Sequence, residues 1–120
     1  MKKILLVEDD SEYRTLLSKK LKTLGYFIYE AKSGQEGLQY LKSSVIDLIL
    51  LDLVMLKMDG LKFYQFYKKI SQNKTPILIL SNIVLSDKDK ISKKKYIVDY
   101  IIKSNINLDS LTERIKTFIN

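Results

Sequence analysis

The 120-residue chain contains no cysteine and no histidine. Without cysteine it can form no disulfide and offers no thiol nucleophile, which is compatible with a reducing compartment. Without histidine it can hold neither a Ser-His-Asp triad nor a His-ligated zinc ion, and it cannot carry a phosphohistidine itself. These two absences exclude the commonest nucleophilic and zinc-dependent hydrolases.

Long apolar runs are absent as well. No stretch approaches the ~20 apolar residues of a membrane helix. Only four apolar residues separate Met1-Lys2-Lys3 from Glu8, fewer than the ~7 to 15 of a signal-peptide core. We therefore expect a cytoplasmic protein with no membrane partner. A hydrophobic content of 46% is enough for one core, so we expect a single domain over residues 1–120 without an output domain.

Glycine and proline are few, whereas lysine is abundant. Lysine and arginine total 21 against 14 acids, a net charge of +7. Such a field can attract nucleic acid, anionic lipid or acidic proteins, but a genome-wide codon bias together with solubility is the favoured explanation. The densest basic run is more typical of a solvated helix face than of a docking surface: Lys88, Lys90, Lys93, Lys94 and Lys95.

Four short apolar runs end at residues that carry chemistry. They are Ile4–Val7 before Glu8-Asp9-Asp10, Leu48–Leu51 before Asp52, Ile77–Leu80 before Ser81, and Tyr100–Ile102 before Lys103. Continuous apolar runs of this length are typical of strands buried on both faces, which occur in parallel sheets covered by helices. Ligands of such sheets bind beyond the carboxyl ends of the strands. The pattern therefore predicts carboxylates, a hydroxyl and an ammonium group at one edge of a sheet.

Helical patterns separate these runs. The predicted elements are a helix through Leu16, Leu17, Leu21 and Leu24 that stops at Gly25, a polar edge strand 26–30, a helix capped by Ser33 and Glu36, a strand 46–51, helices 61–70 and 87–95, strands 77–80 and 97–102, and a last helix capped by Asn107. The aromatic residues Phe63, Tyr64, Phe66 and Tyr67 have helical spacing, which favours core packing over a cofactor site. The whole chain thus fits one (βα)5 unit.

Four motifs, in this order and spacing, resemble the receiver domain of two-component response regulators: KILLVEDD, LLDLVMLKMDG, ILILSN and DYIIKS. The resemblance covers essentially all 120 residues. It implies a CheY-like, flavodoxin-like fold, an α/β doubly wound sheet of five parallel strands in the order 2-1-3-4-5 with helices on both faces. That order would place Asp9 and Asp52 on adjacent strands.

The chemistry of these residues can be argued on its own. The Asp52 carboxylate can take a phosphoryl group and hold it as an acyl phosphate. Glu8, Asp9 and Asp52 offer the oxygen ligands that Mg²⁺ prefers, and a close group of acids favours a bound cation. Lys103 supplies a positive charge for phosphoryl oxygens, and Ser81 supplies a hydroxyl that can donate to one of them.

The resemblance assigns more specific roles. It implies that Asp52 is the phosphoacceptor, that Glu8, Asp9, Asp52 and the backbone carbonyl of Val54 hold Mg²⁺, and that Lys103 contacts the phosphoryl group. It implies that Ser81 and Tyr100 form a switch that changes the face of the fourth helix, fifth strand and fifth helix. The expected protein is a signalling phosphoacceptor that assists its own phosphorylation and dephosphorylation, not an enzyme.

The resemblance also implies partners. A sensor histidine kinase or a phosphotransfer protein would donate the phosphoryl group, and a downstream effector or an output domain would read the result. A homodimer through the same helix–strand–helix face is a further possibility, with Asp99 and Arg114 as an ion pair between the two copies. Asp10 and Asp59 are predicted to be a loop acid and a helix cap without a direct catalytic role.

The chain departs from the family pattern at several positions. Leu56 stands where proline is frequent, Lys57 where glycine is frequent, Asn82 where a smaller residue is usual, and Tyr96-Ile97 where a Gly-Ala pair is usual. Ser104 replaces a cis proline after Lys103. A cis bond before another residue costs ~3 kcal/mol, which favours a trans bond here and a different direction for Lys103. These departures concern phosphate access and switching, and they remove no chemical group.

Two other functions stay open. Altered loops are compatible with a pseudo-receiver, an interaction module that is not productively phosphorylated. The lysine-rich helix is compatible with a nucleic-acid or acidic-surface binder, although nucleic acid is not the expected partner of this domain alone. A P-loop or flavin site is excluded because no glycine-rich loop follows the first apolar run.

Overall fold

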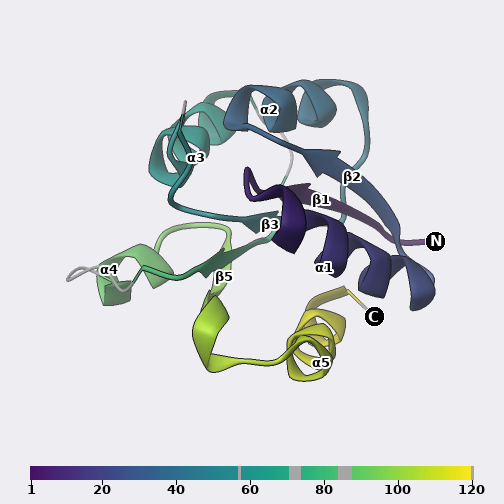
Figure 1. Cartoon of the computed structure of the whole chain (residues 1–120). Helices are drawn as coiled ribbons and strands as arrows, with labels where there is room; N and C mark the ends of the chain where they lie inside the picture. The colour runs from purple at the N-terminus through teal and green to yellow at the C-terminus, as the bar shows by residue number, and fades with distance from the viewer. Residues whose placement is uncertain (57, 71–73, 84–87, 120) are drawn as a thin grey trace.

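Five parallel strands form a single twisted sheet at the centre of the computed structural model (Figure 1). The structure describes residues 1–56, 58–70, 74–83 and 88–119. The strands are β1 (Lys3–Val7), β2 (Phe27–Ala31), β3 (Leu48–Leu51), β4 (Ile77–Ser81) and β5 (Ile97–Ile102). Their order is β2-β1-β3-β4-β5, which confirms the predicted doubly wound topology.

Helices cover both faces of this sheet. They are α1 (Ser11–Thr23), α2 (Gly34–Ser43), α3 (Gly60–Ile70), α4 (Lys88–Ser92) and α5 (Leu108–Ile119), with a 3₁₀ turn η1 (Lys103–Asn105) after β5. Helices α1 and α5 lie on one face, and α2 and α3 on the other (Figure 1). Among the described residues, no helix has the length and apolar character needed to cross a membrane.

Successive residues of a strand point to opposite faces of the sheet and pack into two separate core clusters. Leu5 and Val7 of β1 pack into the cluster beneath α2 and α3, whereas Ile4 and Leu6 pack into the cluster beneath α1 and α5. Because both sides are covered, every residue of β3 and β4 is buried. This is why these strands read as continuous apolar runs in the sequence.

The strand register brings the carboxyl ends to one edge. Val7 of β1 pairs with Leu51 of β3, so Glu8 and Asp52 each follow a paired residue. On the other side of β3, Leu51 pairs with Ile79, and further along β4 Ser81 pairs with Ile102. Parallel strands in register therefore deliver Glu8, Asp52, Ser81 and Lys103 to the same edge.

Most helix ends follow the predicted signals. Ser33 Oγ accepts a hydrogen bond from Glu36 N at 3.2 Å, and Asn107 Oδ1 accepts one from Ser110 N at 2.8 Å. Gly25 has a φ of +94° just after α1, a conformation that glycine adopts readily. Asp59 caps α3 by accepting from Lys62 N at 2.8 Å, as predicted.

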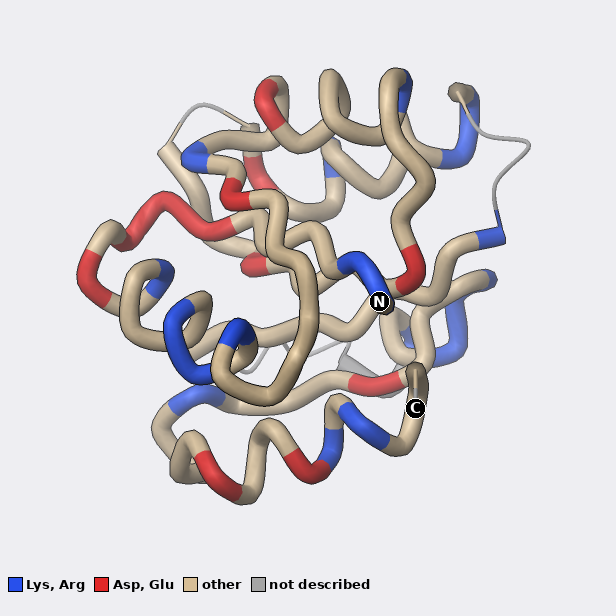
Figure 2. Tube along the Cα trace, turned by 90° about the vertical axis from the view of Figure 1, so that its right-hand side faces the viewer, with Lys and Arg blue, Asp and Glu red and all other residues tan. Residues whose placement is uncertain are grey.

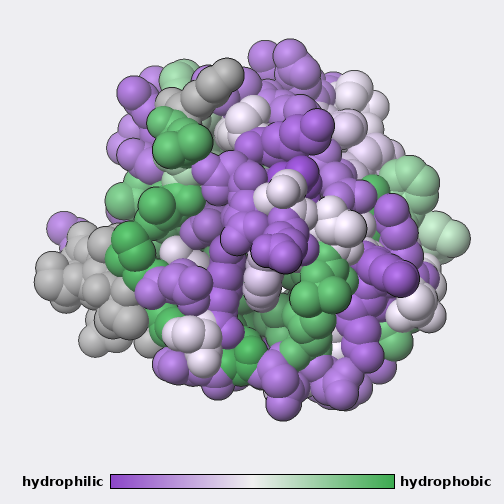
Figure 3. All heavy atoms as spheres, in the orientation of Figure 1, coloured by the Kyte–Doolittle hydropathy of each residue, from purple (hydrophilic) through white to green (hydrophobic). Residues whose placement is uncertain are grey.

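Several expectations differ from the structure. Asp10, expected to be a loop acid, is the N-cap of α1 and accepts hydrogen bonds from Glu12 N and Tyr13 N. Leu16 and Phe66, expected in the core, are 55% and 40% exposed because they lie away from the buried stripe of their helices. Leu24 is also partly exposed, as the C-cap that follows α1. On the side shown in Figure 3, hydrophobic patches are separated by hydrophilic surface.

Two elements are shorter than predicted. Strand β3 begins at Leu48, two residues later than expected, while β2 is shifted by one residue. Helix α4 ends at Ser92 instead of Lys95, and the predicted start at Asp87 lies outside the described residues. The chain then turns at Tyr96, which has a φ of +73° and packs its ring edge-on against Tyr67. A single buried apolar residue in α4, Ile91, gives this helix little packing along its length.

Candidate functional site

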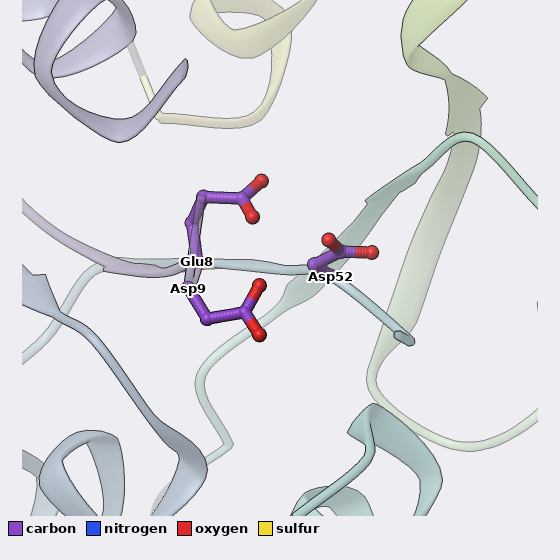
Figure 4. Close-up of side chains that lie close together, drawn as sticks. All are labelled: Glu8, Asp9 and Asp52. Carbon is purple, nitrogen blue, oxygen red and sulfur yellow. The ribbon is translucent and has the colours of Figure 1, made fainter. Parts of the chain in front are cut away.

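Three acids meet at the carboxyl edge of the sheet. Glu8 and Asp9 follow β1 and Asp52 follows β3, and one carboxylate oxygen from each lies within 4.8 Å of the others (Figure 4). Glu8 is 2% exposed and Asp52 is 7% exposed, whereas Asp9 is half-buried. The predicted acid cluster is therefore present, and two of its members are largely removed from water.

Each of these carboxylates is oriented by a hydrogen bond from a backbone N–H group. Glu8 Oε2 accepts from Asp10 N at 3.1 Å, and Asp52 Oδ1 accepts from Val54 N at 3.2 Å. Asp9 Oδ2 accepts from Leu56 N at 3.1 Å, although these residues are far apart in sequence. The loop after β3 thus orients two acids, Asp9 and Asp52, through its own backbone.

Lys103 inserts its ammonium group into this cluster. Its Nζ donates to Glu8 Oε1 and lies 3.2 Å from Asp52 Oδ2, and its side chain is 9% exposed. The Lys103–Ser104 bond is trans, as the cost of a cis bond suggested. Lys103 nevertheless reaches both carboxylates, so the missing proline does not turn it away from the site.

The electrostatics keep Lys103 charged. Burial lowers the pKa of Lys103, but the hydrogen bond and charge of Glu8, together with the charge of Asp52, outweigh burial and raise it above its ordinary value. Burial raises the pKa of Glu8, and the hydrogen bond from Lys103 offsets only part of this effect. Three carboxylates and one ammonium group leave a formal charge of about −2, which a divalent cation would neutralise.

The donor set fits Mg²⁺. The three ligand candidates are all carboxylates, and the chain has no thiolate or imidazole that would favour zinc or copper. Asp9 also borders a pocket of about 280 Å³, whose other lining residues are Lys32, Ser33, Glu36, Met55 and Leu56. The structure does not test the predicted role of the Val54 carbonyl.

Two residues of α1 complete the surroundings of the cluster. The Nζ of Lys103 lies 4.5 Å from the centroid of the Tyr13 ring. Burial, with the charges of Glu8 and Asp52, raises the pKa of Tyr13 to about 12. Arg14 is buried and donates from Nη1 to the Glu8 carbonyl at 2.8 Å. Sequence reasoning missed both residues, although their helical spacing to Leu17 and Leu21 places them on the inward side of α1.

Ser81 and Tyr100 meet at the loop after β4. Ser81 is fully buried, and its Oγ accepts from Ile83 N at 3.4 Å. The Tyr100 hydroxyl donates to the Ile83 carbonyl at 2.7 Å, with its ring buried. Both predicted switch residues therefore hold the same short segment of backbone.

Two of the departures from the family pattern are joined to each other. Asn82 Oδ1 accepts a hydrogen bond from Ser104 N at 3.0 Å. Proline at position 104 would lack this donor. The bond links the residue after Ser81 to the residue after Lys103, across the carboxyl ends of β4 and β5. Lys57, another departure, lies outside the described residues.

The predicted dimer residues pair within one chain. Arg114 Nη2 of α5 donates to Asp99 Oδ2 of β5 in the same molecule. The two residues thus connect neighbouring elements of a single copy. Their predicted role between two copies remains a prediction.

Comparisons with known proteins match the chain to one family. Residues 4–116 match the family described as response regulator receiver domain. The chain is 34% identical over 122 residues to a probable transcriptional regulator, ycf27, of Cyanidium caldarium, covering 95% of this chain and 47% of that protein. It is 38% identical over 78 residues to the transcriptional regulatory protein GlrR of Escherichia coli, covering 65% of this chain and 17% of that protein. The chain thus spans less than half the length of each relative.

Solved structures show the same fold. TrrA from Thermotoga maritima, crystallised in complex with Mg²⁺-BeF, superposes with a TM-score of 0.85 at 32% identity, covering 99% of this chain and 100% of that chain. The chemotaxis protein CheY4 of Vibrio cholerae gives a TM-score of 0.89 at 28% identity, with 99% of each chain covered. These similarities do not favour the nucleic-acid-binding alternative.

Proposed function

This chain belongs to the family of response regulator receiver domains, and from that premise we propose that Asp52 accepts a phosphoryl group in a two-component signalling pathway. The observation that carries the proposal is the convergence of Glu8, Asp9 and Asp52 with the ammonium group of Lys103. Lys103 pairs with Glu8 and Asp52 but not with Asp9, so the cluster carries more negative charge than its one ammonium group neutralises, and a bound cation would offset the excess.

The proposed reaction is a phosphoryl transfer between proteins. A carboxylate oxygen of Asp52 attacks the phosphorus of a phosphohistidine on a sensor kinase or phosphotransfer protein. The phosphorus–nitrogen bond breaks, the imidazole leaves, and Asp52 carries an acyl phosphate. Such a transfer depends mainly on positioning and on stabilising charge at the phosphoryl oxygens.

Residues of the site supply that stabilisation. Glu8, Asp9, Asp52 and the backbone carbonyl of Val54 would hold Mg²⁺, which supplies positive charge next to the phosphoryl oxygens when bound. Lys103 adds the second positive charge, and the Ser81 hydroxyl donates to a phosphoryl oxygen. Because Lys103 already reaches Asp52, it needs no large movement to do so.

The switch that we propose runs through the loop after β4. Ser81 and Tyr100 both bond to Ile83, so a shift of the Ser81 hydroxyl toward a phosphoryl group changes the same backbone that Tyr100 holds. Tyr100 lies on β5 and Ile83 precedes α4. The face formed by α4, β5 and α5 would therefore respond to phosphorylation and bind a downstream effector or an output domain.

Intact-mass measurement tests this function. The chain is incubated with Mg²⁺ and a small phosphodonor, and wild type is expected to gain the mass of one phosphoryl group. Asp52→Asn should gain none, whereas Asp59→Asn should behave as wild type because Asp59 caps α3 and is not one of the three clustered acids. A wild-type protein that gains no mass would instead identify a pseudo-receiver.

A further inference from the structure

The excess of positive over negative charge in this chain is confined to one segment of the sequence. Residues 60–97 contain nine lysines and two acids, whereas the rest of the chain contains twelve basic and twelve acidic residues. The entire net charge of +7 therefore belongs to the segment that runs from α3 through α4 and the turn that follows it. In α5, by contrast, acidic and basic residues both occur (Figure 2). A general codon bias toward lysine raises lysine throughout a chain, so it does not account for this separation.

Three of these lysines surround a groove between α3 and α4. Lys68 contributes from α3, Lys90 from α4, and Lys94 from the turn that follows. The groove has a volume of about 220 Å³, and Leu61, Tyr64, Gln65 and Ile91 complete its lining. Among the residues that the structure describes, none of those lining the groove is acidic. The positive charges thus converge on one small concave surface.

The groove lysines lack counterions among the described side chains. Elsewhere, Lys20, Lys22 and Lys116 pair with Asp109, Glu30 and Glu113. Lys68 and Lys94 instead lie 5.0 and 6.0 Å from the centroid of the Tyr64 ring. The Tyr64 hydroxyl is fixed by a hydrogen bond to the Lys95 carbonyl at 2.8 Å. The ring therefore holds two ammonium groups at the groove by cation–π attraction.

We propose that this groove binds an acidic segment of a partner protein, with carboxylates at Lys68, Lys90 and Lys94 and an apolar side chain against Leu61. Leu61 is half-buried and offers an apolar contact beside the charges. Ammonium groups act as point charges that carboxylates satisfy well. The groove shares no residue with the acid cluster, so it is a separate binding surface that does not use Asp52 itself.

Charge alone also suits nucleic acid, but the aromatic geometry does not. Single-stranded nucleic acid binds to basic grooves by stacking bases on accessible rings. Tyr64 is only 4% exposed, and its ring is occupied by lysines of its own chain. A groove of this size receives a few side chains of a peptide, which leaves the acidic protein segment as the occupant.

Fluorescence anisotropy tests the proposal with the full chain and a labelled peptide of alternating glutamate pairs and leucines. The variant Lys68→Glu/Lys90→Glu/Lys94→Glu should weaken binding by about 30-fold, the combined effect of three lost ion pairs. The matched control Lys2→Glu/Lys19→Glu/Lys42→Glu reverses the same number of exposed charges outside the groove. The control should weaken binding by less than about 3-fold, since distant surface charges are screened by salt.

Three outcomes would overturn the proposal. If both triple variants bound the peptide with equally reduced affinity, the peptide would be attracted by the overall charge of the protein and not by the groove. If a peptide with glutamine in place of glutamate bound equally well, carboxylates would not be the groups that the groove recognises. Tighter binding of a single-stranded oligonucleotide of equal charge, competing with the peptide, would make nucleic acid the occupant. If circular dichroism shows that the glutamate variant does not fold, the variant with glutamine at the same three lysines replaces it. This variant should bind the peptide about 10-fold more weakly than wild type, and an unchanged affinity would reject the groove as the binding site.

Discussion

At the scale of single residues, the stability of the acid cluster depends on two opposing interactions: repulsion among its carboxylates and their attraction to one buried ammonium group. Two carboxylates ~4 Å apart repel by ~4 kcal/mol at an effective dielectric of 20. Lys103 bonds to Glu8 and Asp52, while Asp9 is held by a backbone N–H of the loop after β3. Asp9 therefore adds repulsion to the cluster without taking part in its ion pairs.

Substitutions at Asp9 and Lys103 should consequently change stability in opposite directions. Without divalent ions at neutral pH, Asp9→Asn should raise the free energy of unfolding by about 1 kcal/mol, because Asp9 is half-buried and its repulsion is partly screened. Lys103→Met should lower it by about 2 to 4 kcal/mol, because two buried carboxylates lose their cation. Urea denaturation in EDTA measures both, and destabilisation by Asp9→Asn would contradict the repulsive cluster.

Tyr13 should keep its proton to unusually high pH. Burial and the charges of Glu8 and Asp52 raise its pKa to about 12, compared with ~10 for an exposed tyrosine. Absorbance of phenolate near 295 nm should therefore be equal in wild type and Tyr13→Phe up to about pH 11 and differ only above it. One additional phenolate in wild type at pH 10.5 would contradict this assignment.

The same shift predicts a dependence of stability on pH. In the unfolded chain Tyr13 ionises near pH 10, whereas in the folded protein it ionises only near pH 12. A raised pKa in the folded state contributes stability below pH 10, and this contribution is lost as the pH rises toward 12. Relative to Tyr13→Phe, wild type should thus lose stability above pH 10, which urea denaturation at several pH values measures.

At the scale of elements, one side-chain hydrogen bond links the ends of two strands. Asn82 follows β4, and its Oδ1 accepts from Ser104 N in η1. The bond lies beside Lys103 and Ser81, so it limits how far their two loops separate. Exposed hydrogen bonds of this kind contribute about 0.5 to 1.5 kcal/mol.

Asn82→Ala should therefore lower the free energy of unfolding by about 1 kcal/mol and speed amide exchange at Ser104. Ser104→Ala is the matched control, because the donor is the backbone N–H and the serine hydroxyl is not part of the bond. Hydrogen exchange followed by NMR measures the effect at residue 104. Equal exchange in wild type and Asn82→Ala would show that the bond does not hold the loop.

The features that could be predicted from the sequence are those that depend on residues close together in the chain. Buried parallel strands need unbroken apolar runs, so the ends of β1, β3, β4 and β5, and hence Glu8, Asp52, Ser81 and Lys103, could be located in advance. The caps Ser33 and Asn107 could be found because a cap depends on nearby backbone N–H groups. The pairing of Asp9 with Leu56 N and the position of Tyr13 over Lys103 depend on distant segments meeting in space. No local pattern carries that information.

At the scale of the whole molecule, the site and the core belong to one sheet. Both core clusters include the last strand residues before the acids: Val7 and Leu51, directly before them, lie in one cluster, and Leu6 and Leu50, one position earlier, lie in the other. The cation binding proposed at Glu8, Asp9 and Asp52 would therefore be linked to folding of the entire domain. The three carboxylates converge only when β1 and β3 are paired.

Mg²⁺ should accordingly raise the melting temperature of the whole protein. A ligand that binds only the folded state at ten times its dissociation constant stabilises it by about 1.4 kcal/mol, which shifts the melting temperature by about 4 to 6 °C in a domain of this size. Asp52→Asn and Asp9→Asn should lose most of this shift, whereas Asp59→Asn should retain it because Asp59 only caps α3. Thermal melts with Mg²⁺, compared with potassium chloride at equal ionic strength, separate binding from screening. An equal shift in wild type and Asp9→Asn would place the cation elsewhere on the molecule.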